Sequence, residues 1–210
     1  MGRAIWGAIG VSAAIWGWAA PLSGAEEAAA ERPVVLEKGD KAPAFSAKTD
    51  EDKLWKSADH VGKKYLVVYF YPADMTGGCT AQACQYRDAL AEQKRDDVAI
   101  VGVSGDSVEN HKHFKQVHSL NFTLLADPEG KIAKAFGVKA GDGGELTRTI
   151  EGADVLFVRG VTAQRWTFLI DLDGRIAYVD RRVDPRADAA NVLQVIDKLA
   201  SGRVGETASE

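Results

Sequence analysis

The sequence predicts an α/β fold in which a mixed central sheet carries helices on both faces. Short apolar runs rich in β-branched and aromatic residues alternate with longer segments rich in Ala, Gln, Leu and Lys. The runs Tyr65–Phe70 and Val98–Val103 are continuous and apolar, which is typical of strands buried on both faces. Near the C-terminus, Asp171-Leu-Asp-Gly174 separates two further apolar runs and indicates a β-hairpin.

The order of these elements is that of a thioredoxin-like fold: strand–helix–strand–helix, an inserted strand and helix, a hairpin and a last helix. Gly137 is expected to stop the third helix, and an amphipathic pattern defines the fourth. The expected strands are Ala44–Lys48, Lys53–Lys56, Tyr65–Phe70, Val98–Val103, Phe122–Leu125, Trp166–Ile170 and Ile176–Val179. The expected helices are Cys79–Arg95, Val108–Ser119, Gly130–Phe136 and Ala187–Leu199.

The segment Ala140–Val161 is long for a connection within a compact domain. Its glycine-rich start, Gly141–Gly144, predicts a flexible loop, and Asp154–Val158 predicts an extra strand or a flap. We treat residues 140–161 as an inserted loop or flap. Such segments are often functional, but a plain surface excursion fits the sequence equally well.

Composition is that of an ordinary soluble protein with one sizeable core, because 46% of the 210 residues are hydrophobic and 27% are charged. We expect a linker at 26–36, a single domain at 37–201 and a flexible C-terminal tail at 202–210. The net charge is −4 and no long basic stretch occurs, so nothing indicates a nucleic-acid or anionic-membrane partner.

The N-terminus predicts a secretory signal peptide spanning residues 1–25. Arg3 is followed by an uncharged run from Ala4 to Ala20, and Ser23-Gly24-Ala25 supplies a small-x-small cleavage site. We therefore expect an exported protein, periplasmic in a bacterium, with no stable membrane insertion after cleavage. The alternative is an uncleaved membrane anchor, although the run is shorter than the roughly 20 residues that a span needs.

The chain has two cysteines, Cys79 and Cys84, and an oxidising compartment makes a structural disulfide the first alternative. A disulfide that closes so short a loop removes little entropy from the unfolded chain, so it would stabilise the fold only slightly. This disfavours a structural role. Both cysteines fall in an expected helix, where residues five apart have Cα atoms roughly 8–9 Å apart. A disulfide needs less than about 7 Å, so bridging requires part of the helix to unwind. A strained, readily reduced bond suits catalysis.

Cys79 follows the strand Tyr65–Phe70 and a loop containing proline and glycine, and it stands where the next helix begins. Free N–H groups and the positive end of the helix dipole stabilise a thiolate at such a position. Cys84 could then capture the oxidised form of Cys79. His111 and His113, two residues apart, would lie on different faces of a helix, so we expect solvated surface histidines and no metal site.

The stretch from Tyr69 to Cys84 (YFYPADMTGGCTAQAC) strongly resembles the active-site segment of peroxiredoxins, whose signature is Pro-x3-Thr-x2-Cys. A second cysteine five positions on resembles the branch of peroxiredoxin Q, or bacterioferritin comigratory protein. The likeness covers roughly residues 36–200, apart from the long segment Ala140–Val161. Its further motifs are Asn121–Asp127, Phe136–Val138 and Arg165–Gly174.

The resemblance implies a thiol peroxidase that reduces hydrogen peroxide and organic hydroperoxides without cofactor or metal. Cys79 corresponds to the peroxidatic cysteine, and Cys84 to the resolving cysteine of an intramolecular disulfide. Thr76 matches the hydroxyl that bonds peroxide and thiolate, Pro72 the residue that shields the sulfur, and Arg165 the arginine of the family's Arg-x-Ser/Thr-Phe pattern. Thioredoxin or a similar dithiol protein would be the reductant, and the enzyme would be a monomer or homodimer.

Each assignment has an alternative. Thr76 could cap the helix, Pro72 could end the strand, and Arg165 could be a surface arginine. At the level of function, the alternatives are an extracytoplasmic thiol–disulfide exchange protein and a non-catalytic redox-sensing binding module. This chain lacks the Cys-x-x-Cys pair that thiol–disulfide exchange proteins carry, which disfavours the first of these alternatives.

Overall fold

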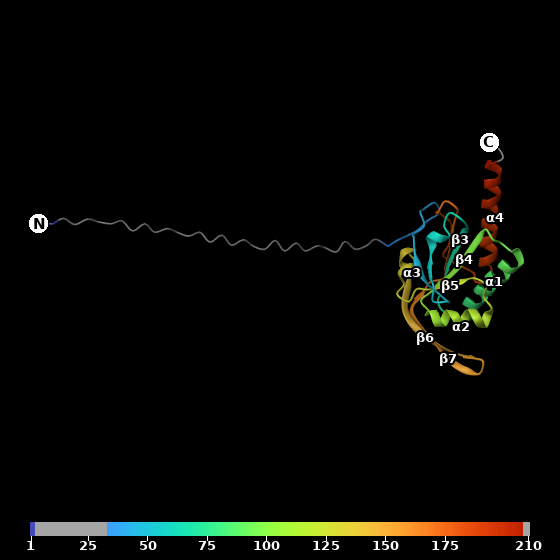
Figure 1. The fold of residues 1–210 in the computed structure, drawn as a ribbon, viewed down its shortest axis with the longest axis horizontal. Helices are drawn as coiled ribbons and strands as arrows, with labels where there is room; N and C mark the ends of the chain where they lie inside the picture. Colours follow the sequence, from blue (N-terminus) through green and yellow to red (C-terminus); the bar gives the residue numbers. More distant parts are fainter. Residues whose placement is uncertain (3–32, 208–210) are drawn as a thin grey trace. The chain divides into compact units, whose positions relative to one another are not determined.

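The domain is built around a seven-stranded mixed sheet (Figure 1). The computed structural model describes residues 1–2 and 33–207. The expected signal peptide at 1–25 falls almost wholly outside the described residues, as does most of the linker. The strands are β1 Ser46–Thr49, β2 Leu54–Lys56, β3 Tyr65–Phe70, β4 Val98–Ser104, β5 Thr123–Ala126, β6 Ala140–Ile150, β7 Ala153–Ala163, β8 Trp166–Ile170 and β9 Ile176–Asp180. The helices are α1 Gly77–Gln93, α2 Val108–His118, α3 Lys131–Ala135 and α4 Asp188–Thr207, with a 3₁₀ turn at Ser57–Asp59.

The strand order in the large sheet is β2-β1-β5-β4-β3-β8-β9. Strands β3, β4 and β5 run parallel, whereas β8 is antiparallel to β3 and β9 to β8. The pairing of Phe70 with Trp166 places the start of β8 beside the end of β3. This register brings the residue before β8, Arg165, to the place where the chain leaves β3 for α1.

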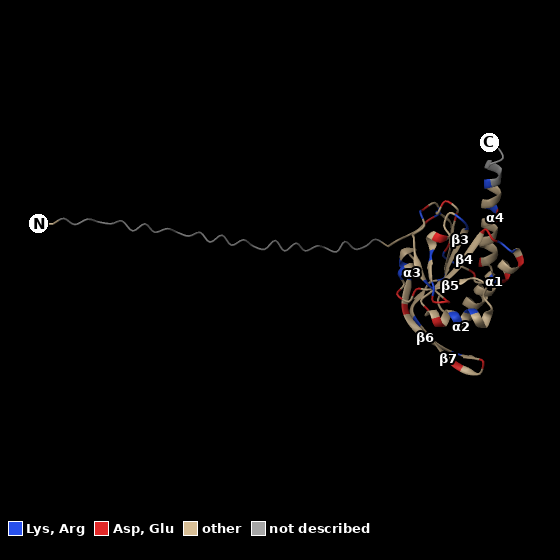
Figure 2. Cartoon of the chain, in the orientation of Figure 1, with Lys and Arg blue, Asp and Glu red and all other residues tan. Residues whose placement is uncertain are grey.

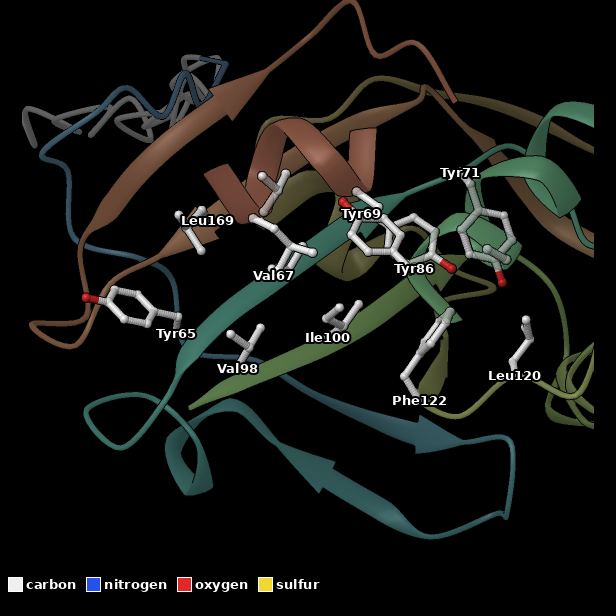
Figure 3. Close-up of a cluster of buried hydrophobic side chains, with 14 of the residues drawn as sticks. Tyr65, Val67, Tyr69, Tyr71, Tyr86, Val98, Ile100, Leu120, Phe122 and Leu169 are labelled. Carbon is white, nitrogen blue, oxygen red and sulfur yellow. The ribbon is translucent and has the colours of Figure 1, made fainter. Parts of the chain in front are cut away.

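Helices pack on both faces of the sheet, as the sequence predicts. Tyr65, Val67 and Tyr69 of β3 point into a core shared with α1, α2 and α4 (Figure 3). Leu66 and Phe70 point into the opposite core, which contains α3. Every residue of β3 is buried, which explains why this strand is apolar throughout and not alternating.

The last helix is longer than expected. It continues past Leu199 to Thr207, so residues 202–207 are helical where a flexible tail was predicted. Gly202 and Gly205 within this stretch have low helix propensity, which is why sequence alone ended the helix early.

The segment Ala140–Val161 is a long β-hairpin, and the expectation of a flexible loop at Gly141–Gly144 is wrong. Strands β6 and β7 pair antiparallel from Ala140↔Ala163 to Ile150↔Ala153. Glu151 (φ 51°) and Gly152 (φ 85°) form the two-residue turn between them, with the positive φ values that tight hairpins require. The turn sequence Ile150-Glu-Gly-Ala153 indicates a hairpin less strongly than Asn-Gly does, so the sequence alone does not predict this one.

The base of this hairpin is fastened to the domain through backbone contacts. The N–H of Gly160 donates to the carbonyl of Gly105 (2.9 Å), and the side-chain amide of Asn110 on α2 donates to the backbone carbonyl of Val158 (2.9 Å). A Cβ on Gly105 would lie 2.1 Å from the Val161 carbonyl oxygen. Glycine is therefore required at position 105 for the hairpin to approach this closely.

Basic and acidic residues are interspersed over the domain (Figure 2). Among the described residues, no helix is both long enough and apolar enough to cross a membrane.

We expect Gly105→Ala to loosen the hairpin, because the new methyl group would overlap the Val161 carbonyl. The free energy of unfolding should fall by about 1–3 kcal/mol, the usual cost of overpacking, and amide exchange should rise in β6 and β7. Gly141→Ala is the control, since a Cβ there has no described atom within 4 Å. Equal losses of stability in both variants would contradict the close approach.

Candidate active site

The candidate site is built where β3 ends and α1 begins. After β3, the chain passes the half-buried Pro72 and turns at Met75, whose φ is 58°. Helix α1 then starts at Gly77, with Thr76 in the N-cap position. Cys79 is the third residue of α1, so its sulfur lies in the first turn, where backbone N–H groups have no partner within the helix. The geometry favours a negative charge at this sulfur.

Cys79 is 1% exposed, and Cys84 is partly exposed further along α1. Both are free thiols. Because both lie in one uninterrupted helix, the structure holds them apart in the reduced form, as the helix geometry predicts.

The Thr76 hydroxyl does not cap α1. It donates instead to the carbonyl of Ala73 (3.1 Å), within the loop that precedes the helix. This hydrogen bond uses the proton of the hydroxyl and leaves its oxygen able to accept a hydrogen bond from a bound molecule.

Arg165 reaches the cysteine from the start of β8. Its Nη2 lies 3.2 Å from the Sγ of Cys79, and its Nη1 lies 2.5 Å from the Oε1 of Gln82. A Cβ on Gly78 would come within 3.3 Å of Nη2, so the glycine leaves room for the guanidinium beside the helix. The alternative that Arg165 is an ordinary surface arginine is inconsistent with these two contacts.

A buried hydrogen-bond network continues behind Arg165. Gln82 turns its amide so that Oε1 accepts from Arg165 and Nε2 donates to Oδ2 of Asp188 (2.7 Å). The hydroxyls of Tyr86 and Thr167 donate to the same carboxylate oxygen, each at 2.8 Å. Burial raises the pKa of Asp188, and these three hydrogen bonds act against that shift. Asp188 thereby fixes the orientation of the Gln82 amide, and through it that of Arg165.

The profile of the AhpC/TSA family matches residues 38–179. The chain belongs to this family. Peroxiredoxin Bcp of Bacillus subtilis is 39% identical over 167 residues, which cover 80% of this chain and 99% of that protein. The chloroplastic peroxiredoxin Q of Oryza sativa subsp. japonica is 34% identical over 165 residues, covering 78% of this chain and 68% of that protein.

Solved structures agree with these relatives. Peroxidoxin BcpB of Mycobacterium tuberculosis superposes with a TM-score of 0.64 at 27% identity, covering 78% of this chain and 97% of that one. The bacterioferritin comigratory protein of Xanthomonas campestris gives 0.62 at 27% identity, covering 78% and 99%. The thioredoxin-like fold and the resemblance to the Bcp and peroxiredoxin Q branch are confirmed, and the protein is a thiol peroxidase.

Two residues of the candidate site, Gln82 and Asp188, are not predicted from the sequence. Gln82 lies three residues after Cys79 and hence on the same face of α1, a spacing that could have flagged it. Asp188 had no such signal, because it reaches Gln82 only through the packing of α4 against α1. The described residues contain no cluster of three or more His, Cys, Asp or Glu side chains suited to a metal ion.

The expectation of a solvated surface for His111 is wrong. Its side chain is fully buried, and its Nδ1 lies 2.8 Å from Oδ2 of Asp74. Tyr71 donates its hydroxyl to the other oxygen of Asp74 (2.8 Å), and the Asp74 N–H donates to Asp106 (2.9 Å). These contacts tie the loop before Thr76 to α2 and to the connection between β4 and α2. His113, by contrast, is one-third exposed and faces Glu109 at 3.6 Å.

The pKa of His111 is raised. Burial disfavours the imidazolium and lowers it, but the charge and hydrogen bond of Asp74, together with Asp106, outweigh burial. A raised pKa means that the folded state binds this proton more tightly than the unfolded chain does. The stabilisation is complete below the unfolded value of about 6.5 and is lost as pH rises through the folded pKa.

We expect Asp188→Asn to slow peroxide reduction, because a neutral amide holds the Gln82 side chain less firmly and lets Arg165 drift from the sulfur. The loss in kcat/KM should be on the order of tenfold or more. The pH–rate profile should shift to higher pH, which general destabilisation would not cause. Asp184→Asn is the control, since Asp184 contacts the backbone of Arg186 and not Gln82. Identical kinetics in both variants would remove Asp188 from the site.

His111→Gln should reduce stability most at low pH. Below pH 6 the free energy of unfolding should fall by about 2 kcal/mol, and the gap to the unsubstituted protein should narrow as pH rises through the raised pKa of His111. Chemical denaturation between pH 5.5 and 9 measures this gap. His113→Gln serves as the control and should show little change. A gap that widens with pH would contradict the assigned direction.

Proposed function

We propose that Cys79 is the peroxidatic cysteine of this thiol peroxidase and that hydrogen peroxide and organic hydroperoxides are its substrates. The observation that carries the proposal is the guanidinium of Arg165, 3.2 Å from a buried sulfur in the first turn of α1. A thiolate there has a fixed cation beside it and helix N–H groups below it, and arginine stays charged at every relevant pH.

The first step transfers one oxygen atom. The Cys79 thiolate attacks the terminal oxygen of R–O–O–H, the S–O bond forms as the O–O bond breaks, and RO⁻ leaves. The products are a Cys79 sulfenic acid and, after the alkoxide takes up a proton, the alcohol or water. Arg165 and the N–H groups of the first turn stabilise the negative charge as it moves from sulfur to the leaving oxygen.

Two further residues have roles in this step. Thr76 lies at the N-cap, and its hydroxyl oxygen can accept a hydrogen bond from the terminal O–H of the peroxide. Pro72, half-buried between β3 and the loop, fixes the chain and limits access of water to the sulfur. All the residues invoked belong to one chain, and we propose that the enzyme is a monomer or a homodimer.

Cys84 resolves the sulfenic acid. Its thiol attacks the Cys79 sulfur, water leaves and an intramolecular disulfide forms. A disulfide requires Cα atoms closer than about 7 Å, so the first turns of α1 must unwind. The strained bond is then open to thiol–disulfide exchange with thioredoxin or a similar dithiol protein, which restores both thiols and lets α1 re-form.

Cys79→Ser should abolish peroxide consumption, because a hydroxyl is scarcely ionised at neutral pH. Cys84→Ser is the matched variant, since it removes a thiol from the same helix. It should still react with one equivalent of peroxide, stall as sulfenic acid and over-oxidise to sulfinic acid with excess peroxide. Mass spectrometry of the two variants after single and repeated peroxide additions separates these outcomes.

In the unsubstituted protein, oxidation should speed amide exchange across residues 78–86. Exchange that is the same in both redox states would disprove the unwinding. Normal turnover of Cys84→Ser with a dithiol reductant would show that Cys84 is not required, and peroxide turnover by Cys79→Ser would overturn the proposal as a whole.

We further propose that the enzyme is exported, with cleavage after Ala25. Support comes from Arg3, the apolar run Ala4–Ala20 and the small residues before Glu26. The mature protein should begin at Glu26 and partition with periplasmic markers on osmotic shock, which N-terminal sequencing and fractionation would detect. An intact N-terminus in the membrane fraction would favour the anchor instead, and one in the cytoplasmic fraction would exclude export.

A further inference from the structure

A groove of about 640 Å³ opens between the tip of the β6–β7 hairpin, α2 and the loop that precedes the catalytic helix. Ile150, Ala153 and Val155 line it from the hairpin, Val117 from α2, and Met75 from the loop. The remaining lining is polar and comes from the hairpin turn and from α2. Neither the hairpin nor the groove has a role in the mechanism described above.

The groove adjoins the site of peroxide reduction. Met75 immediately precedes Thr76, and its partly buried side chain packs against the apolar cluster that contains Cys79. Arg148, near the hairpin tip, donates from Nε to the carbonyl of Met75 (3.1 Å). This hydrogen bond holds the tip against the loop, and the packing of His113 on Phe157 (ring centroids 6.1 Å apart) holds β7 against α2.

Size and lining indicate what the groove can hold. Its volume falls in the range of small-molecule sites, roughly 300–1,000 Å³. The groove is therefore much larger than hydrogen peroxide, which has only two heavy atoms. Val117 is 43% exposed and lies in this lining, so apolar surface remains in contact with water when the groove is empty. An aliphatic chain would remove that surface from water.

We propose that this groove binds the apolar tail of an organic hydroperoxide while the O–O group lies at Cys79. The proposal rests on the assigned role of Cys79 and adds a substrate preference to it. The chemical step does not change: the terminal oxygen passes to sulfur, and the tail leaves as the alkoxide and then the alcohol. The hairpin contributes binding energy, so it favours hydroperoxides with a carbon chain long enough to pass Met75.

A series of uncharged n-alkyl hydroperoxides, from ethyl to octyl, tests this with hydrogen peroxide as reference. The measurement is the second-order rate constant for Cys79 oxidation in a single turnover, with Cys84 present. The rate constant should rise with chain length by up to about fourfold for each methylene group buried. Hydrogen peroxide should be reduced at a rate that does not depend on the groove.

Two variants make the lining polar without adding charge. Val117→Gln alters an exposed position on α2, where folding is not at risk, and Val155→Gln alters the hairpin wall. Both should flatten the dependence on chain length and lower the octyl rate constant about tenfold or more, with hydrogen peroxide unaffected. Leu156→Gln is the control: it follows Val155 on the same strand but is 53% exposed and lies outside the groove.

An unsubstituted enzyme without chain-length dependence would overturn the proposal, as would variants that keep the full dependence. If Val117→Gln slowed only the reduction of the disulfide by a dithiol protein, the groove would belong to the reductant and the proposal would again fail. These results are distinct from failure of the Cys79 assignment, in which Cys79→Ser would still consume hydrogen peroxide.

Discussion

The catalytic cycle proposed here depends on holding a negative charge on the sulfur atom of Cys79, which is almost completely buried. Burying a charge is costly unless a partner compensates for it, and the chain supplies two partners from distant parts of the sequence. One is the first turn of α1, which carries Cys79 itself. The other is Arg165, brought 3.2 Å from the sulfur because β8 starts beside the end of β3. The sheet register therefore sets how close the guanidinium of Arg165 lies to the sulfur.

The side chain of Arg165 in turn has to be kept in position, and the uncharged amide of Gln82 does this. Gln82 lies between the guanidinium and the buried carboxylate of Asp188, with which Tyr86 and Thr167 also form hydrogen bonds. A direct ion pair with Asp188 would offset part of the positive charge of Arg165. The amide transmits orientation and leaves the positive charge directed at the sulfur.

The same helix has opposite tasks in the two halves of the proposed cycle. Intact, its first turn stabilises the thiolate; unwound, it lets Cys84 reach the oxidised sulfur. Gly77 and Gly78 begin α1, and glycine costs a helix about 1 kcal/mol relative to alanine. The glycines make the first turn easy to unwind, and Gly78 also leaves room for Arg165. The hydrogen bonds among Asp74, His111 and Asp106 keep the preceding loop in place, so the unwinding can be confined to the helix.

The sequence by itself determined the order along the chain of the seven strands of the large sheet, the strand β3 to the residue and the position of Cys79 at a helix start, because these depend on local apolar patterns and on one dense motif. It also pointed to Arg165 and Thr76, though only through resemblance. Only the tertiary structure decided that His111 is buried, that Asp188 supports Arg165 and that Ala140–Val161 is a docked hairpin. Each of these results from contacts between residues far apart in the chain. Periodicity reports which face of an element is apolar; it does not report which polar side chains meet when distant elements pack together.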